Sequence, residues 1–296
     1  MDPVTKSHLN TTAQPSKTVK VGQFEVNRLG YGAMRLTGEG VFGEPKDPAN
    51  ARKVLQRAVE LGVNFIDTAD CYGPEVSERL IGEALAPYKS GLVIATKAGL
   101  VHPGPNGKPP LPIVGNPGYI FQQVELSLRR LKTDALDLWQ LHAIDPKVPV
   151  EETLGAAVKL QEQGKIKEIG LSNVTLAEIK QASKVARIVS VQNIYNVGYR
   201  PNEDVLTYCE ENGLAFLPWF PMMGGGLAQR TGKLEQSARR HNATSSQLSI
   251  AWLLHCSPVM LPIPGTSSLK HLEENMKAAG IILSDKEWAE IEAEAK

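Results

Sequence analysis

Apolar residues recur along this chain in two alternating patterns. Short apolar runs, which are typical of buried strands, are separated by longer segments in which apolar residues return at helical spacing. In residues 150–163, for example, Val150, Leu154 and Ala157 recur at that spacing, and Gly164 ends the pattern. The patterns therefore predict strands and helices in alternation.

These patterns predict eight consecutive strand–helix pairs. Strands are predicted near residues 28–34, 63–68, 92–97, 135–141, 167–171, 188–194, 214–220 and 259–264. Helices are predicted near residues 48–61, 75–87, 117–131, 150–163, 175–186, 202–212, 234–255 and 268–279. Strict alternation with no linker or shift in composition favours an α/β fold, a closed (β/α)8 TIM barrel.

The two ends of the chain add to this barrel. Residues 1–17 are polar and without pattern, and we expect a disordered tail there. Residues 18–21 and 24–26 alternate around a glycine-containing pair, which predicts a β-hairpin. Residues 284–295 predict an extra C-terminal helix. We therefore expect a single domain over residues 18–296.

Composition and charge narrow the class of protein. The chain of 296 residues has 42% hydrophobic and 22% charged residues, which is ordinary for a soluble protein with a core. Its 32 basic and 32 acidic residues cancel, so no global field attracts nucleic acid or an anionic membrane. No run of eighteen apolar residues occurs. We expect neither nucleic acid nor membrane as a partner.

Cysteine and histidine usage bears on two further kinds of site. Three widely spaced cysteines, Cys71, Cys209 and Cys256, form no Cys-x-x-Cys pair and fit a reducing compartment, so we expect a cytoplasmic protein. The six histidines show no His-x-His or His-Glu-x-x-His spacing. The sequence therefore predicts no metal site.

One glycine pattern imitates a dinucleotide-binding motif. Gly38, Gly40 and Gly43 have the spacing G-x-G-x-x-G, whose last glycine opens a helix that holds a pyrophosphate. Here the helix begins only near Pro48, with Asp47 as its expected cap. We favour a flexible loop, and a doubly wound dehydrogenase built on these glycines is the alternative.

Four polar residues stand where strand-like runs end. Asp67, Lys97 and His142 end the second, third and fourth predicted strands, and Tyr72 lies on the loop just beyond Asp67. In a (β/α)8 barrel, functional groups collect at the carboxyl ends of the strands and on the loops after them. A carboxylate, an ammonium, an imidazole and a phenol gathered there suit the donation of a proton to a carbonyl oxygen while hydride reaches its carbon.

Each of the four also has a structural alternative. Asp67 fits a structural role as a cap of the loop that follows it. Lys97 fits a solvated lysine at the end of a strand. His142 fits a core histidine and Tyr72 a turn aromatic. A free phenol with a pKa of about 10 is a poor acid at neutral pH, and a neighbouring ammonium lowers that value. Because the four lie on consecutive strands, we favour the catalytic interpretation.

These residues belong to motifs that resemble those of the aldo-keto reductases. The resemblance covers about residues 18–280. It is carried by GVNFIDTADCYG (62–73), IATK (94–97), LH (141–142), IGLSN (169–173) and SVQNIYN (190–196). It implies a (β/α)8 barrel closed at the bottom by the hairpin, with NADPH bound at the top. The segment PGTS (264–267) and the short chain are most similar to the bacterial pyridoxal-reductase-like branch.

The resemblance implies a role for each of the four residues. Tyr72 would be the general acid, with its pKa lowered by Lys97. Asp67 would pair with Lys97 and hold it in place. His142 would orient the substrate carbonyl by hydrogen bonding.

The same resemblance implies where the cofactor lies. Ser172, Asn173 and Gln192 would hold the nicotinamide carboxamide; alternatively, the first two form a turn and cap, and the third is a buried polar residue. Trp219 stands where the family usually has a tyrosine that stacks on the nicotinamide, and its alternative is a core tryptophan. The expected cofactor-binding residues are Ser172, Asn173, Gln192, Trp219, Phe220, Pro221, Met222, Gly224, Gly226, Ile263, Pro264, Gly265, Thr266, Ser267, Lys270, His271, Glu274 and Asn275.

Phosphate-binding groups are expected after the last two strands. Residues 224–226 are glycines, which let backbone N–H groups approach a pyrophosphate or form a plain flexible turn. The resemblance places the adenosine half of the cofactor at residues 263–275. Gly265 and His271 stand where many relatives grip the 2′-phosphate with lysine and arginine. NADPH (NADP⁺) is still favoured over NADH, with weaker binding of the 2′-phosphate.

Two segments are expected to enclose the substrate. Residues 102–118 contain six prolines and predict a stiff, irregular loop, which with residues 36–46 and Trp219 would wall a pocket or else form a surface connection. We predict an NADPH-dependent reductase of a small-molecule aldehyde or ketone, as a monomer or weak homo-oligomer. The alternative from another class is a redox-sensing module that binds cofactor with little turnover.

Overall fold

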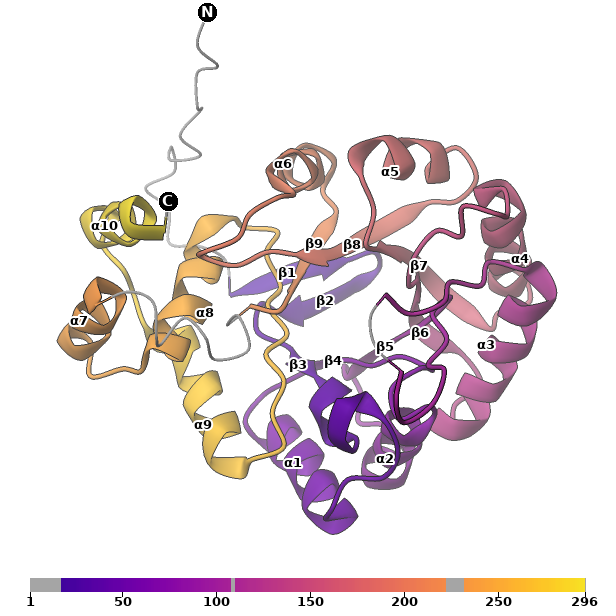
Figure 1. Cartoon of the computed structure of the whole chain (residues 1–296), viewed down its shortest axis with the longest axis horizontal. Helices are drawn as coiled ribbons and strands as arrows, with labels where there is room; N and C mark the ends of the chain where they lie inside the picture. The colour runs from indigo at the N-terminus through magenta and orange to yellow at the C-terminus, as the bar shows by residue number, and fades with distance from the viewer. Residues whose placement is uncertain (1–16, 108–109, 222–231, 296) are drawn as a thin grey trace, which may run out of the picture.

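A curled sheet of seven parallel strands forms the centre of the molecule, and each strand pairs with the next one along the chain (Figure 1). The computed structural model describes residues 17–107, 110–221 and 232–295. Each strand overlaps one that the apolar runs predict. The strands are β3 (Tyr31–Gly32), β4 (Phe65–Asp67), β5 (Val93–Ala98), β6 (Leu136–Leu141), β7 (Ile166–Ser172), β8 (Ile188–Ile194) and β9 (Ala215–Trp219).

The eighth predicted strand is an extended segment that closes the ring. On one side of residues 259–264, the backbone N–H of Leu261 donates to the carbonyl of Phe216 on β9 at 2.8 Å. On the other side, Gly30, just before β3, donates to the carbonyl of Pro262 at 3.0 Å. Prolines in this segment have no N–H to donate, so a regular ladder does not form. The segment still joins both edges of the sheet and completes the (β/α)8 barrel.

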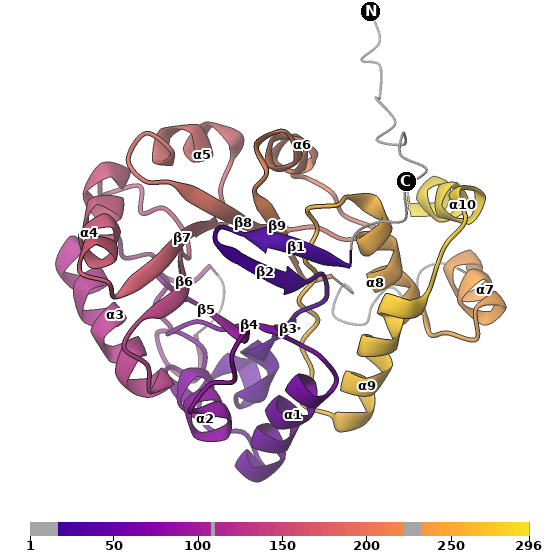
Figure 2. The same cartoon turned by 180° about the vertical axis from the view of Figure 1, so that it is seen from behind.

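The N-terminal hairpin lies across the bottom of the barrel, as Figure 2 shows. β1 (Thr18–Val21) pairs antiparallel with β2 (Phe24–Asn27), which confirms the predicted hairpin. Its turn is fixed where the backbone N–H of Gln23 donates to the buried Glu168 carboxylate at 2.8 Å. The hairpin's apolar side chains join the cluster inside the barrel, which includes Phe65.

Helices surround the sheet, and their apolar faces form a second, larger cluster between the two layers. Two of them begin with a proline in the first turn after an Asp or Asn cap, which sets the start of the helix. The helices are α1 (Pro48–Glu60), α2 (Val76–Leu85), α3 (Pro117–Leu131), α4 (Val150–Glu162), α5 (Leu176–Ala182), α6 (Glu203–Asn212), α7 (Gly232–Arg240), α8 (Ser245–Cys256), α9 (Leu269–Lys277) and α10 (Asp285–Ala295), with short 3₁₀ turns η1 (Ala33–Leu36), η2 (Glu39–Val41) and η4 (Ala278–Gly280).

The prediction of one helix over residues 234–255 is wrong, because this segment contains two helices. The first ends at Arg240, and the second begins after Thr244. The Thr244 side chain accepts from the backbone N–H of Gln247, whose own side chain accepts from the backbone of Thr244. This capping box starts a new helix. Its Thr-x-x-Gln pattern is present in the sequence, but the apolar spacing continues through it and predicts a single helix.

The Gly38–Gly43 segment forms a loop rather than the start of a helix. It closes on itself where Gly38 N–H donates to the Gly43 carbonyl at 3.0 Å. It also pairs with the loop that carries Tyr72, since Gly73 N–H donates to the Val41 carbonyl at 3.0 Å. The barrel topology excludes a doubly wound dehydrogenase, so these glycines do not form its phosphate-binding turn.

Candidate active site

An ion pair closed to solvent lies at the carboxyl ends of two neighbouring strands. Asp67 ends β4 and pairs in register with Ala95 on β5. Lys97 comes two residues after Ala95, so its side chain lies on the same face of the sheet. Lys97 Nζ donates to Asp67 Oδ1 at 2.6 Å and to the Thr68 carbonyl at 2.8 Å. The exposed fractions of the two side chains are 0% and 2%. Because both groups are buried, each charge is stabilised by the opposite charge and by nearby hydrogen-bonding dipoles rather than by water.

Two amides satisfy the second oxygen of the Asp67 carboxylate. Gln140 Nε2 donates to Oδ2 at 3.0 Å, and Gln192 Nε2 donates to the same oxygen at 2.8 Å. The amide nitrogen of Gln192, which the sequence assigns to the nicotinamide carboxamide, is therefore engaged by Asp67. Gln140 is absent from the sequence prediction. Its only signal is a polar side chain two residues before His142 on a strand that is otherwise mostly apolar.

Tyr72 and His142 lie beside this pair. Lys97 Nζ is 3.5 Å from the Tyr72 hydroxyl, at the outer limit of a hydrogen bond, and 5.1 Å from the centre of its ring. The rings of Tyr72 and His142 meet edge to face with centroids 6.0 Å apart. Part of the Tyr72 side chain is open to solvent, whereas His142 is buried. The structure thus brings the four predicted side chains together around Tyr72, a residue of intermediate burial.

The surroundings keep the phenol and the imidazole uncharged. Burial, followed by the negative charge of Asp67, raises the pKa of Tyr72 well above its usual value. Burial and the positive charge of Lys97 lower the pKa of His142 well below its usual value. The expected lowering of the Tyr72 pKa by Lys97 is not found, because Asp67 offsets the ammonium and the phenol is largely withdrawn from water.

Besides Gln192 on β8, the residues expected at the nicotinamide lie at the ends of β7 and β9. Asn173 adopts a left-handed conformation with φ of 55°, and its Nδ2 donates to the His142 carbonyl and to Ser172 Oγ, both at 3.0 Å. Trp219 Nε1 is buried and has no hydrogen-bond partner among the described residues. Phe220 comes next with φ of 59° and is 41% exposed.

Part of the predicted cofactor set lies beyond the residues that the structure describes. Pro221 is described and buried. Met222, Gly224 and Gly226 lie outside the described residues.

Gly265 occupies a place where no side chain fits. A Cβ on Gly265 would lie 2.6 Å from the Gly32 carbonyl oxygen, and a Cβ on Gly32 would lie 2.6 Å from that of Ile263. Ile263 and Pro264 are buried where this crossing closes the barrel. A lysine in place of Gly265 requires a different backbone path here.

Polar groups gather at the start of α9. The Ser268 side chain accepts from the His271 backbone N–H at 3.4 Å, and Thr266 Oγ1 accepts from Ser268 N–H at 3.1 Å. Lys270 is 80% exposed, with Nζ 3.8 Å from Glu274. Exposed cations at a helix N-terminus favour an anion.

The other predicted adenosine-side residues take part in local packing. The Ser267 carbonyl accepts from Asn50 Nδ2 and the Glu274 carbonyl from Gln247 Nε2, both at 2.8 Å. Asn275 is buried, with 5% of its surface exposed.

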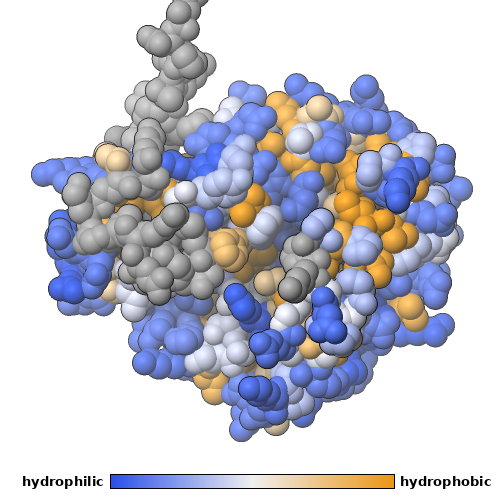
Figure 3. All heavy atoms as spheres, viewed as in Figure 1, coloured by the Kyte–Doolittle hydropathy of each residue, from blue (hydrophilic) through white to orange (hydrophobic). Residues whose placement is uncertain are grey.

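Two loops meet above the barrel mouth. His102 Nε2 lies 3.2 Å from the Gly40 carbonyl oxygen, and the rings of Phe42 and His102 are 5.0 Å apart. The segments expected to wall a pocket are therefore in contact. Figure 3 shows this face, where hydrophobic residues form patches between hydrophilic ones, mainly toward the upper right of the view.

A (β/α)8 barrel with a polar cluster at the carboxyl ends of its strands is typical of enzymes. Comparison of the sequence with known protein families identifies which family this is. The model of the Aldo/keto reductase family matches residues 28–296. The chain therefore belongs to the aldo/keto reductase family and is an oxidoreductase. None of the helices in the described part of the chain has the length and apolar character that crossing a membrane requires.

Relatives with this fold agree in sequence over nearly the whole chain. An uncharacterized oxidoreductase of Schizosaccharomyces pombe is 50% identical over 96% of this chain and 92% of its own length. The pyridoxine 4-dehydrogenase of Escherichia coli is 43% identical over 91% of this chain and 95% of its own. A solved aldo-keto reductase of Klebsiella pneumoniae in complex with NADPH is 28% identical, covers 94% of each chain and has a TM-score of 0.81.

Proposed function

We propose that this protein reduces an aldehyde or ketone to an alcohol, with NADPH as the reductant and Tyr72 as the proton donor. The observation that carries the proposal is the Tyr72 hydroxyl 3.5 Å from Lys97 Nζ, beside the closed Lys97–Asp67 pair. NADPH supplies the hydride when it is bound. The chain's own groups position the carbonyl and deliver the proton.

The protonation states support this role. Tyr72 is a neutral phenol because burial raises its pKa, so its hydroxyl carries a proton. The raised pKa also makes the phenol a weaker acid, so proton transfer to a carbonyl oxygen depends on stabilisation of the phenolate. His142 stays neutral because burial lowers its pKa, so it acts as a hydrogen-bond donor without bringing a charge. Lys97 lies near enough to stabilise the phenolate left after transfer, and Asp67 holds the ammonium in place.

Several features at the barrel mouth fit NADPH. Trp219 ends β9 at the barrel mouth, where its flat indole suits stacking on a nicotinamide ring. Lys270 and His271 are exposed near the N-terminus of α9 and suit a 2′-phosphate. The relative from Klebsiella pneumoniae that was solved with NADPH supports the same choice. We therefore infer NADPH as the cofactor, with NADH second.

Replacing Tyr72 tests the proposed chemistry. We expect Tyr72→Phe to lower kcat by about 100-fold or more, the scale of lost acid catalysis, while NADPH fluorescence quenching is retained. Tyr199→Phe, which alters an exposed phenol outside the cluster, is the matched control and should keep the wild-type rate. A Tyr72→Phe enzyme with wild-type turnover would remove the mechanism.

The similarity to pyridoxine 4-dehydrogenase suggests pyridoxal as the first carbonyl to assay. A panel of aldehydes and ketones tests the substrate class, and tight NADPH binding without multiple turnover would support a redox-sensing module instead. A single domain over residues 18–296, a cytoplasmic location and a monomer or weak homo-oligomer remain predictions.

A further inference from the structure

Three metal-binding side chains meet beside the proposed proton donor. Asp70, Cys71 and His142 are all buried, and one ligand atom of each lies within 4.8 Å of the others. Cys71 Sγ is 3.7 Å from His142 Nδ1. Asp70 and Cys71 are neighbours in sequence, whereas His142 comes from a strand end 71 residues after Cys71. Sequence spacing therefore cannot reveal this set.

One oxygen of Asp70 lacks a partner although the side chain is buried. Asp70 Oδ2 accepts from the Tyr119 hydroxyl at 3.2 Å, while Oδ1 has no hydrogen-bond partner in the described part of the chain. Asp70 is only 4% exposed. A buried acceptor left unsatisfied costs roughly 1–3 kcal/mol, so this oxygen points to an occupant, either a cation or a proton.

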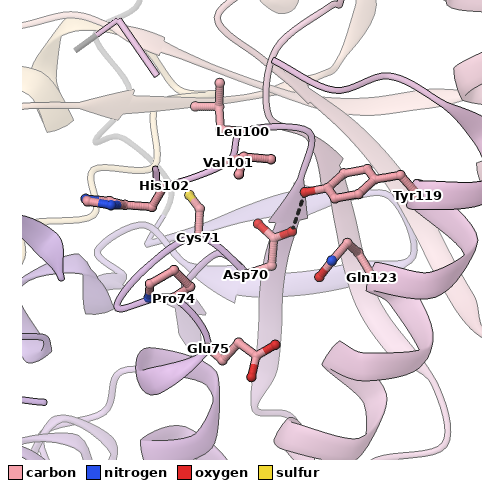
Figure 4. Close-up of a pocket in the computed structure, with 9 residues that line it drawn as sticks. All are labelled: Asp70, Cys71, Pro74, Glu75, Leu100, Val101, His102, Tyr119 and Gln123. Atoms are coloured by element: carbon pink, nitrogen blue, oxygen red, sulfur yellow. Dashed lines mark hydrogen bonds between the residues drawn. The ribbon is translucent and has the colours of Figure 1, made fainter. Parts of the chain in front are cut away.

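A small pocket lies beside Asp70 and Cys71, and His142 is not among the residues that line it. It has a volume of about 110 Å³ and is lined by Asp70 and Cys71 together with polar side chains that include Glu75, His102 and Gln123. Figure 4 shows the Asp70 oxygen that is not bonded to Tyr119 on the same side as the Cys71 sulfur. Since a water molecule occupies about 30 Å³ in the liquid, the pocket beside Asp70 and Cys71 has room for water that would complete the coordination of an ion.

We propose that Asp70, Cys71 and His142 form a binding site for a divalent metal ion of the zinc class. Carboxylate oxygen, thiolate sulfur and imidazole nitrogen are the ligands that Zn²⁺ takes in proteins, and three of them plus a water give a tetrahedral site. Zinc–ligand bonds of about 2.0–2.3 Å put ligand atoms roughly 3.3–3.8 Å apart.

The side-chain positions suit that geometry. The sulfur–nitrogen distance of 3.7 Å already matches a tetrahedral edge. An Asp70 carboxylate oxygen lies within 4.8 Å of the other two ligand atoms and has to close by at most about 1.5 Å. Metal binding releases the thiol proton of Cys71 to solvent. When Asp70 is protonated, its carboxyl proton is released to solvent as well.

The site would act as an inhibitory one, a consequence that rests on the proposed function. His142 is the residue assigned to orient the carbonyl, and a metal on Nδ1 ties its ring to Asp70 and Cys71. The ion also adds positive charge near Lys97, which already contributes a positive charge at His142. We expect Zn²⁺ to suppress carbonyl reduction reversibly, with recovery on addition of a chelator.

Metal binding is tested directly with the full chain, without reference to turnover. The chelator-treated protein is titrated with Co²⁺, which reports thiolate coordination by a near-ultraviolet charge-transfer band, and then with Zn²⁺ as competitor. We expect one Co²⁺ per chain, displacement by Zn²⁺, and loss of the band in Cys71→Ala. Cys256→Ala, which removes another free cysteine, is the control and should keep the band.

A second variant guards against misfolding of the first. Asp70→Asn keeps the thiol and should weaken Co²⁺ binding by about tenfold or more, with an unchanged circular dichroism spectrum. A band that is absent in the wild-type protein, or equal in Cys71→Ala, would overturn the site and leave the proposed reductase activity untouched. Binding with unchanged turnover would overturn the inhibitory role.

Discussion

Lys97 and Asp67 form a salt bridge of 2.6 Å from which solvent is excluded, and each partner's remaining polar capacity is used by neighbours. The second Asp67 oxygen accepts from Gln140 and Gln192. A buried ion pair contributes little net stability compared with an apolar pair, but removing one partner leaves an uncompensated charge. The pair is therefore a sensitive point for both stability and activity.

We predict that Lys97→Met destabilises the protein by about 3–5 kcal/mol, because Asp67 is left buried and unpaired. Methionine retains most of the side-chain length, so the loss reports the charge rather than a large cavity. The free energy of unfolding from urea titration at neutral pH measures it.

An exposed lysine provides the matched control for this change. Lys167 Nζ lies 2.8 Å from Asp137 Oδ1, but 44% of the lysine side chain is exposed. We expect Lys167→Met to change the free energy of unfolding by less than about 1 kcal/mol. Equal losses in the two variants would show that burial does not set the cost of breaking the Lys97 pair.

The strand ends that carry Asp67, Lys97 and His142 are predictable from the sequence, because apolar runs mark buried parallel strands whose carboxyl ends share one face of the barrel. Gln140 is not predictable, since a polar side chain within a strand gives no sign of which carboxylate it meets. The cluster of Asp70, Cys71 and His142 escapes sequence analysis for a related reason: its members meet only after β4 and β6 are placed in the barrel.

Backbone features set a second limit on prediction. The apolar residues of segment 259–264 predict a strand, and its prolines explain why its pairing is irregular. From the sequence, the glycine at position 265 is interpreted as a lost phosphate ligand. The structure adds a steric reason, the close approach of Gly32, that depends on how the ring closes.

Asp70 makes stability depend on pH. Burial, followed by the negative charge of Glu78, raises the pKa of Asp70 from 3.8 to about 8, while Tyr119 and Arg130 act in the opposite direction. Between these values the folded state holds a proton that the unfolded chain has lost, so stability is present at low pH and falls as pH rises toward 8.

We predict that Asp70→Asn removes this dependence. The difference in free energy of unfolding between the variant and the wild type should shift in favour of the variant between pH 5 and pH 8, by up to about 1.4 kcal/mol per pH unit. Urea titrations at several pH values, with chelator present, give the free energy of unfolding of each protein. The pH dependence of the difference between the two proteins is the test, and a difference that is constant with pH does not affect it. Parallel curves for the two proteins would contradict a raised Asp70 pKa.

Gly265 should tolerate no side chain. A Cβ there meets the Gly32 carbonyl oxygen at 2.6 Å, a backbone atom that moves only with the barrel closure. We predict that Gly265→Ala destabilises the protein by about 1–3 kcal/mol, the usual cost of overpacking. Gly280, whose added Cβ meets nothing within 4 Å, is the control, and Gly280→Ala should stay within about 0.5 kcal/mol of the wild type. Similar effects at both positions, measured by thermal or urea unfolding, would argue against the close crossing.

We expect Lys270 to help distinguish NADPH from NADH. It lies in the first turn of α9, is 80% exposed, and has Nζ 3.8 Å from Glu274. A 2′-phosphate would compete with that carboxylate for the ammonium, so its gain is smaller than for a dedicated lysine–phosphate pair. We predict that Lys270→Ala weakens NADPH binding by about tenfold, which corresponds to about 1.4 kcal/mol, and leaves NADH binding unchanged.

The control for Lys270 is a lysine at the other end of the same helix. Lys277 is exposed in the last turn of α9, where the helix dipole disfavours an anion, so Lys277→Ala should leave both affinities unchanged. Fluorescence quenching with NADPH and NADH in parallel gives both dissociation constants, and repeating it at higher salt should shrink the NADPH advantage. If Lys270→Ala weakens the binding of both cofactors equally, the lysine does not contact the 2′-phosphate.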